Sequence, residues 1–108
     1  MMMPSPDSAT IVMTRERQGS RDRFRSYAVM VDDAQVAKVK RGQTLRLPIS
    51  PGQHEIYLRL DWCRSPAVHV DASPAEIINM YCAPAGGMNE AYDAFVNPDL
   101  YIILKVVE

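Results

Sequence analysis

The sequence has no long apolar run. No segment approaches the roughly 20 consecutive apolar residues that a membrane-spanning helix requires. The first ten residues, MMMPSPDSAT, also lack the basic and apolar regions of a secretory signal. We therefore expect a cytoplasmic protein without a membrane span, in which residues 1–7 form a flexible leader.

The sequence motifs of common enzymes and metal sites are absent too. There is no Gly-x-Ser-x-Gly, no phosphate-binding glycine loop and no His-Glu-x-x-His. Two histidines and two cysteines would suit zinc chemically, but no two of them stand at the short spacing of a compact zinc site. These residues are His54, Cys63, His69 and Cys82. The sequence therefore favours a protein that is not an enzyme and holds neither a metal nor a cofactor.

Helical periodicity is nearly absent, whereas apolar residues alternate with polar ones in short segments separated by turn residues. A chain of 108 residues fits one domain. We predict an all-β fold, a single antiparallel β-sandwich of 7–8 short strands over residues 8–108, with one long loop at 83–98. The expected strands are residues 9–15, 24–31, 35–40, 44–49, 53–62, 67–70, 76–82 and 100–107.

Several residues predict local geometry. Asp32-Asp33 is expected to form a two-residue hairpin turn, although Asp33 adopts a positive φ less readily than glycine. Ser50-Pro51-Gly52-Gln53 fits a type II turn. Pro48 has no N–H to donate, which places the strand at 44–49 at a sheet edge or near a bulge. The strand at 100–107, LYIILKVV, is apolar on both faces, which predicts a position near the centre of a sheet.

The clearest alternation lies in residues 53–62, QHEIYLRLDW. One face carries His54, Ile56, Leu58, Leu60 and Trp62, and the other carries Gln53, Glu55, Tyr57, Arg59 and Asp61. The first set is expected to face the core. The segment runs into Asp-Trp-Cys, which raises the question whether its end forms a functional site.

The run VMVDDAQVAKVKRGQTLRLPISPGQHEIYLRLDWCRS resembles a group of small bacterial proteins and modules of uncharacterised function. Their pattern is a Val-x-Val-Asp-Gly turn, then Gly, Pro-Gly-x-His, an alternating strand and Asp-Trp-Cys-x-Ser. Its first part is also similar to PEGA-type β-modules. The resemblance covers roughly residues 24–65 and departs at Asp33 and Ala37, where glycine would be typical. It implies a small β-sandwich and no particular activity.

The two cysteines each end a predicted strand, so they are candidates for neighbouring positions. Cys63 and Cys82 are open to three interpretations: buried thiols, a disulfide, or a reactive thiol. Trp62 and Tyr81 lie next to them in sequence, and the ring of Trp62 together with that of Tyr57 or Tyr81 is able to stack on a ligand. The alternative function is therefore a small-ligand-binding or catalytic site around Trp62, Cys63, Tyr81, Cys82 and the loop at 83–98.

Residues 15–26, RERQGSRDRFRS, contain five arginines and two acidic residues. Such a segment is a candidate basic patch for an acidic lipid surface or an acidic protein partner. The sequence pI of about 6.1 argues against nucleic acid as the partner. The arginines concerned are Arg15, Arg17, Arg21, Arg23 and Arg25.

The leading hypothesis is a non-enzymatic interaction or accessory module that binds a protein partner or a second copy of itself. Exposed strand edges make strand addition the expected docking mode. The strands predicted at 44–49 and 9–15 are the candidate edges.

Overall fold

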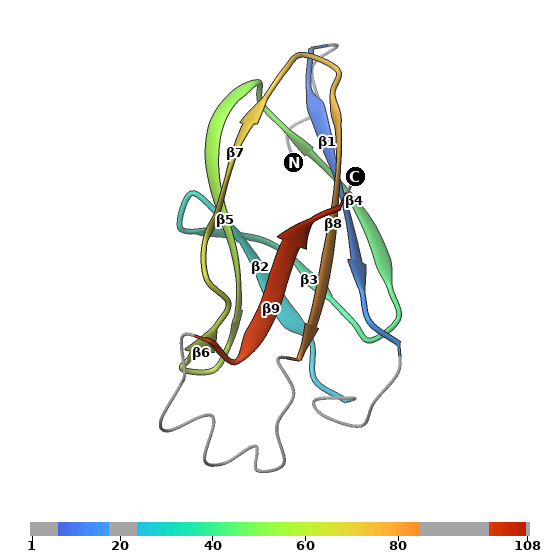
Figure 1. Cartoon of the computed structure of the whole chain (residues 1–108), viewed down its shortest axis with the longest axis vertical. Coiled ribbons are helices and arrows are strands. Elements are labelled where there is room, and N and C mark those ends of the chain that lie inside the picture. The colour runs from blue at the N-terminus through green and yellow to red at the C-terminus, as the bar shows by residue number, and fades with distance from the viewer. Residues whose placement is uncertain (1–6, 18–23, 85–99, 108) are drawn as a thin grey trace.

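The computed structural model describes residues 7–17, 24–84 and 100–107 (Figure 1). These residues form two stacked β-sheets, which confirms the all-β sandwich predicted from the alternation. The strands are β1 (Ala9–Arg15), β2 (Tyr27–Val31), β3 (Ala34–Val39), β4 (Thr44–Ile49), β5 (Gly52–Leu60), β6 (Cys63–Arg64), β7 (Val68–Ala72), β8 (Ile77–Pro84) and β9 (Ile102–Val106). No helix among the described residues is long and apolar enough to cross a bilayer.

The first sheet has the strand order β4-β1-β8-β9, and the second has the order β3-β2-β5-β6, with β7 also paired to β5. The core lies between them because alternate side chains of each strand point inward. On β5 these inward residues are Ile56, Leu58 and Leu60, as the sequence predicts. The same prediction is wrong for Trp62, which lies beyond the end of β5 and is 60% exposed. They pack with the inward residues of β1 and β8, such as Ile11 and Met80.

The prediction of a purely antiparallel sandwich is wrong at one pair of strands. β1 runs parallel to β8, while the other described pairs are antiparallel. Parallel neighbours need a long crossover connection. Here the chain between β1 and β8 supplies the edge strand β4 and the whole second sheet, so a hairpin-by-hairpin reading misses this pairing.

The predicted position of the last strand is also wrong. β9 forms one edge of the first sheet, not its centre. Ile102 and Leu104 point into the core, but Ile103 lies on the outer face and is exposed. The prediction that residues 9–15 form an edge is wrong as well, because β1 lies between β4 and β8.

The two-residue turn at Asp32-Asp33 is confirmed, and Gly52 has the positive φ that the predicted turn at residues 50–53 requires. Asp32 and Asp33 have φ angles of 52° and 65°, and Gly52 has a φ of 117°. Pro48 lies on β4, which is a sheet edge as expected. The strand predicted at 53–62 ends earlier, at Leu60, because Asp61 adopts a φ of 54° and begins the tight turn into β6.

β8 extends two residues past its predicted end and reaches Pro84, so the beginning of the predicted loop at 83–98 belongs to a strand. The rest of that loop and most of the predicted leader at 1–7 lie outside the described residues.

Candidate functional site

The residues predicted to form a ligand site are divided between the two sheets. Trp62 lies on the turn between β5 and β6, where 60% of it is exposed, and Cys63 follows it in β6 and is buried. Tyr81 and Cys82 are adjacent on β8 and point to opposite faces of the other sheet. The indole and the phenol therefore do not form one stacking platform.

The side chain of Tyr81 already has contacts with other residues on the outer face of its sheet. Its hydroxyl donates a hydrogen bond to Glu16, and the ammonium of Lys105 lies 5.4 Å from its ring centroid. The hydrogen bond to the Glu16 carboxylate raises the pKa of Tyr81 to about 12. These contacts give Tyr81 a structural role in linking β1, β8 and β9.

Both cysteines are thiols, and both are buried. Cys63 and Cys82 therefore do not form a disulfide with each other. Burial raises the pKa of the Cys82 thiol to about 12, although the neighbouring Arg15 guanidinium acts in the opposite direction. Cys82 is therefore protonated at neutral pH.

The predicted basic patch is wrong in one central respect. Arg15 is only 1% exposed, and it points into the sandwich as the last inward residue of β1. Arg17 is exposed, and Arg25 forms an exposed ion pair with Asp61. Arg21 and Arg23 lie outside the described residues.

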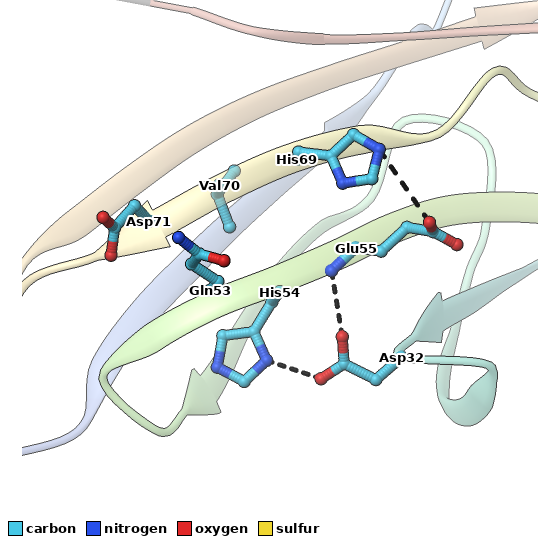
Figure 2. A pocket seen from close by; sticks show the side chains of 7 residues that line it. All are labelled: Asp32, Gln53, His54, Glu55, His69, Val70 and Asp71. Carbon is cyan, nitrogen blue, oxygen red and sulfur yellow. Dashed lines mark hydrogen bonds and ion pairs between the residues drawn. The ribbon is translucent and has the colours of Figure 1, made fainter.

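An open hollow of about 420 Å³ lies along β5 and β7, beside the β2–β3 turn (Figure 2). Antiparallel pairing brings Glu55 opposite His69, with Glu55 Oε2 3.8 Å from His69 Nε2. Among the described residues, no three histidine, cysteine, aspartate or glutamate side chains converge to hold a metal ion. The hollow is lined by Asp32, Gln53, His54, Glu55, His69, Val70 and Asp71.

A polar cluster at this hollow is centred on His54. Its Nδ1 lies 2.6 Å from Asp32 Oδ2, and its Nε2 lies 2.7 Å from the Ser50 carbonyl oxygen and 3.2 Å from Ser50 Oγ. The other Asp32 oxygen accepts a hydrogen bond from the Glu55 backbone N–H at 2.9 Å (Figure 2). The imidazole thus joins the β2–β3 turn to the β4–β5 turn.

Asp32, His54 and Ser50 are the residue types of an acid–base triad, but the geometry gives His54 another role. A ring nitrogen that faces a carboxylate and a ring nitrogen that faces a carbonyl oxygen can both donate only in the protonated ring, so these contacts favour the imidazolium form of His54. The hydrogen bond to Asp32 is the main cause that raises the pKa of His54, and the backbone bond to Ser50 adds to it. In this form the ring has no lone pair with which to activate the Ser50 hydroxyl.

Substitution of His54 by glutamine is expected to lower the free energy of unfolding by about 1 kcal/mol near pH 6, because charge-assisted hydrogen bonds are lost. Since the folded-state pKa is raised above 6.5, this stabilisation is complete below pH 6.5 and disappears as the pH rises through the folded-state value. The Glu55 N–H and then His54 lower the pKa of Asp32. The stabilisation by the His54–Asp32 pair therefore also declines at low pH. It is lost as the pH falls below 3.8 and through the folded-state pKa of Asp32.

Urea denaturation of the two proteins between pH 3 and pH 9 measures this difference. His69→Gln is the matched control, because the His69 side chain is exposed and its Nε2 lies 3.8 Å from Glu55 Oε2, which is too far for a hydrogen bond. It should leave the pH dependence unchanged. Equal losses for His54→Gln at pH 6 and pH 9 would contradict the assignment of an imidazolium.

The sequence predicts that His54 lies in a strand with its side chain on the core-facing side, but it does not identify the partners of the ring. The available signal was its position two residues after the turn glycine Gly52, with the paired aspartates Asp32-Asp33 at another turn. No family model, curated protein or solved structure matches this chain.

Proposed function

We propose that this protein is a non-enzymatic interaction module that adds a strand from a second copy of itself to the outer edge of β9. The observation that carries the proposal is an apolar edge strand whose outer side has no partner strand among the described residues. Unpaired strand edges are templates for pairing with another chain.

The direction of the backbone groups on β9 follows from one hydrogen bond. The N–H of Val107 donates to the carbonyl oxygen of Asn79 on β8 at 2.8 Å. In an antiparallel pair, alternate residues direct their N–H and C=O groups to the same neighbour. Ile102, Leu104 and Val106 therefore direct theirs away from β8, toward the open edge.

The side chains around this edge are mostly apolar and accessible. Leu100, Ile103, Val106 and Val107 are 40–59% exposed, and Ile77 on the neighbouring β8 is 57% exposed. Lys105 is the single charged residue of the strand. Such a cluster of exposed apolar residues at an edge is typical of an interaction surface.

The opposite edge of the same sheet is protected. The Arg15 N–H donates to Gln43 O at 3.0 Å, so Leu45, Leu47 and Ile49 pair with β1. Pro48 and Arg46 then face the open side of β4, where the proline removes a donor and the arginine adds charge. Strand addition at β4, the other predicted edge, is therefore not favoured.

A second copy fits this edge because an antiparallel pair is related by two-fold symmetry. If Leu104 faces Leu104 of the second copy, Lys105 lies opposite Ile103 and the two lysines do not face each other. Ile102 and Val106 then face one another, and the outward backbone groups of both copies are satisfied.

The test is Val106→Pro, which removes an outward N–H and leaves the hydrogen bonds to β8 intact. Light scattering over a concentration series should show a dimer for the original chain, with a dissociation constant at least about tenfold higher for the variant, because each dimer loses two hydrogen bonds. Val106→Thr, which keeps the N–H, is the matched control and should retain most of the association. A chain that stays monomeric up to millimolar concentration would refute self-pairing at β9.

A further inference from the structure

A second open hollow, of about 440 Å³, lies on the outer face of the five-stranded sheet. It is separate from the β9 edge, which belongs to the other sheet. Its lining includes Phe24, Arg25, Ala28, Lys38, Arg59 and Asp61.

Three paired strands form this hollow, with β2 as its floor and β3 and β5 at its two sides. Ala28 on β2 faces Lys38 on β3 on one side and Arg59 on β5 on the other. Facing residues project from the same side of a sheet, and neighbouring strands are about 4.8 Å apart. The two cations therefore stand about 10 Å apart at the backbone with only a methyl group between them, and their long side chains can reach one anion above Ala28.

Most of the other charges nearby are already engaged. Arg25 forms a two-pronged ion pair with Asp61, with Nη2–oxygen distances of 3.0 and 2.8 Å. Arg64 on β6 pairs with Arg59 on β5, and its guanidinium stacks 3.8 Å from the centroid of the Tyr57 ring. Lys38 and Arg59 are exposed and make no hydrogen bond or ion pair with any described residue.

The rim adds an apolar contact. Phe24 lines the hollow and is 87% exposed. An exposed aromatic ring beside two cations suits a ligand that carries both a negative charge and an apolar group.

We propose that this hollow binds an acidic peptide segment of a partner protein, with an aspartate or glutamate carboxylate between Lys38 and Arg59 and an adjacent apolar side chain on Phe24. A phosphate group has no apolar part to contact Phe24, so the acidic peptide is the ligand that uses the whole hollow. Nucleic acid requires a longer track of cations than two unengaged side chains provide. The proposal does not depend on strand addition at β9.

The probe is the acetylated, amidated tetrapeptide Glu-Leu-Glu-Glu, titrated into ¹⁵N-labelled protein and followed by NMR. We expect saturable shifts at the amides of Ala28, Lys38 and Arg59 that weaken as salt is added. The double variant Lys38→Gln, Arg59→Gln should weaken binding by up to about 25-fold, since each exposed ion pair contributes up to about fivefold. Arg46→Gln, which removes an exposed cation from the other sheet, should change the affinity less than about twofold.

Three control ligands separate the possible sources of the interaction. The peptide Gln-Leu-Gln-Gln should cause no saturable shift, because it lacks the carboxylates. Inorganic phosphate and a single-stranded oligonucleotide should bind more weakly than the acidic peptide. The proposal would be overturned by tighter binding of either anion, by equal affinity for the double variant, or by the absence of shifts at millimolar peptide. None of these results bears on self-association, because Val106 lies in the other sheet.

Discussion

Replacement of Arg15 by alanine is expected to lower the free energy of unfolding by about 3–5 kcal/mol. Folded domains are stable by about 5–15 kcal/mol, so this change removes a large part of the total. Urea denaturation followed by circular dichroism measures it. The large effect is expected because Arg15 connects the two sheets from inside the sandwich.

The contacts of the guanidinium explain the size of this effect. Nη1 of Arg15 donates to the backbone oxygen of Arg25 at 2.6 Å and to that of Val39 at 3.0 Å. The guanidinium carbon lies 3.8 Å from the centroid of the Tyr27 ring, which is fully buried. Alanine would leave two carbonyl groups short of a donor, each at a cost of about 1–3 kcal/mol, and would open a cavity over Tyr27.

Two further variants separate these contributions. Arg15→Met keeps most of the side-chain volume but donates no hydrogen bond, and we expect it to lose about 2 kcal/mol or more. Arg15→Lys keeps the charge but lacks the planar group that stacks on Tyr27 while donating to both carbonyls. A methionine variant as stable as the original chain would contradict the connecting role, since it would show that the buried charge contributes no net stability.

The position of Arg15 could have been read from the sequence. In ATIVMTR the alternation that places Ala9, Ile11 and Met13 inward places Arg15 inward too. Its charge favoured the surface interpretation, because an isolated buried cation is costly. The backbone oxygens and the aromatic ring that offset this cost come from β2, β3 and the segment before β2, and local sequence does not indicate that they meet Arg15.

The strand order shows the same limit. Period-two patterns identified most strands and the inward residues of β5, because burial of one face depends on each strand alone. They did not identify that β9 is an edge, because the side-chain pattern of a strand does not state how many neighbours its backbone has. LYIILKVV is apolar on both faces because its outer face belongs to an exposed apolar surface, not because it is enclosed.

The candidate sites were missed for a related reason. Asp32 and His54 are 22 residues apart and meet only because β2 pairs with β5. Lys38 and Arg59 become neighbours of Ala28 through the same sheet. The arginine-rich segment predicts a basic patch because its charges are adjacent in sequence, whereas Lys38 and Arg59 come from two different strands.

The second large effect concerns the thiols. In folded protein, we expect Cys82 to react with a maleimide about a thousandfold more slowly at pH 7 than an ordinary thiol, because burial raises its pKa from 9.0 to about 12 and only the thiolate reacts. The Cys63→Ala variant isolates this rate, and mass spectrometry measures it with N-acetylcysteine as the reference. Exclusion of the reagent from the core slows the reaction further, so labelling should follow unfolding and rise sharply when urea is added.

The same measurement separates the two functional hypotheses. A ligand-binding or catalytic site at Cys82 requires a thiol that small molecules reach in the folded state, and rapid labelling without urea would support that alternative. Labelling that depends on unfolding agrees instead with a thiol that only fills the core.

The charge of Arg15 favours the Cys82 thiolate, so Arg15→Met should not make the thiol of the folded protein more reactive. The same variant also lowers the stability of the fold, and this increases labelling through unfolding. Comparison of the variants at urea concentrations that give equal unfolded fractions removes the stability effect, and a faster native-state reaction of Arg15→Met would then show that the guanidinium shields Cys82.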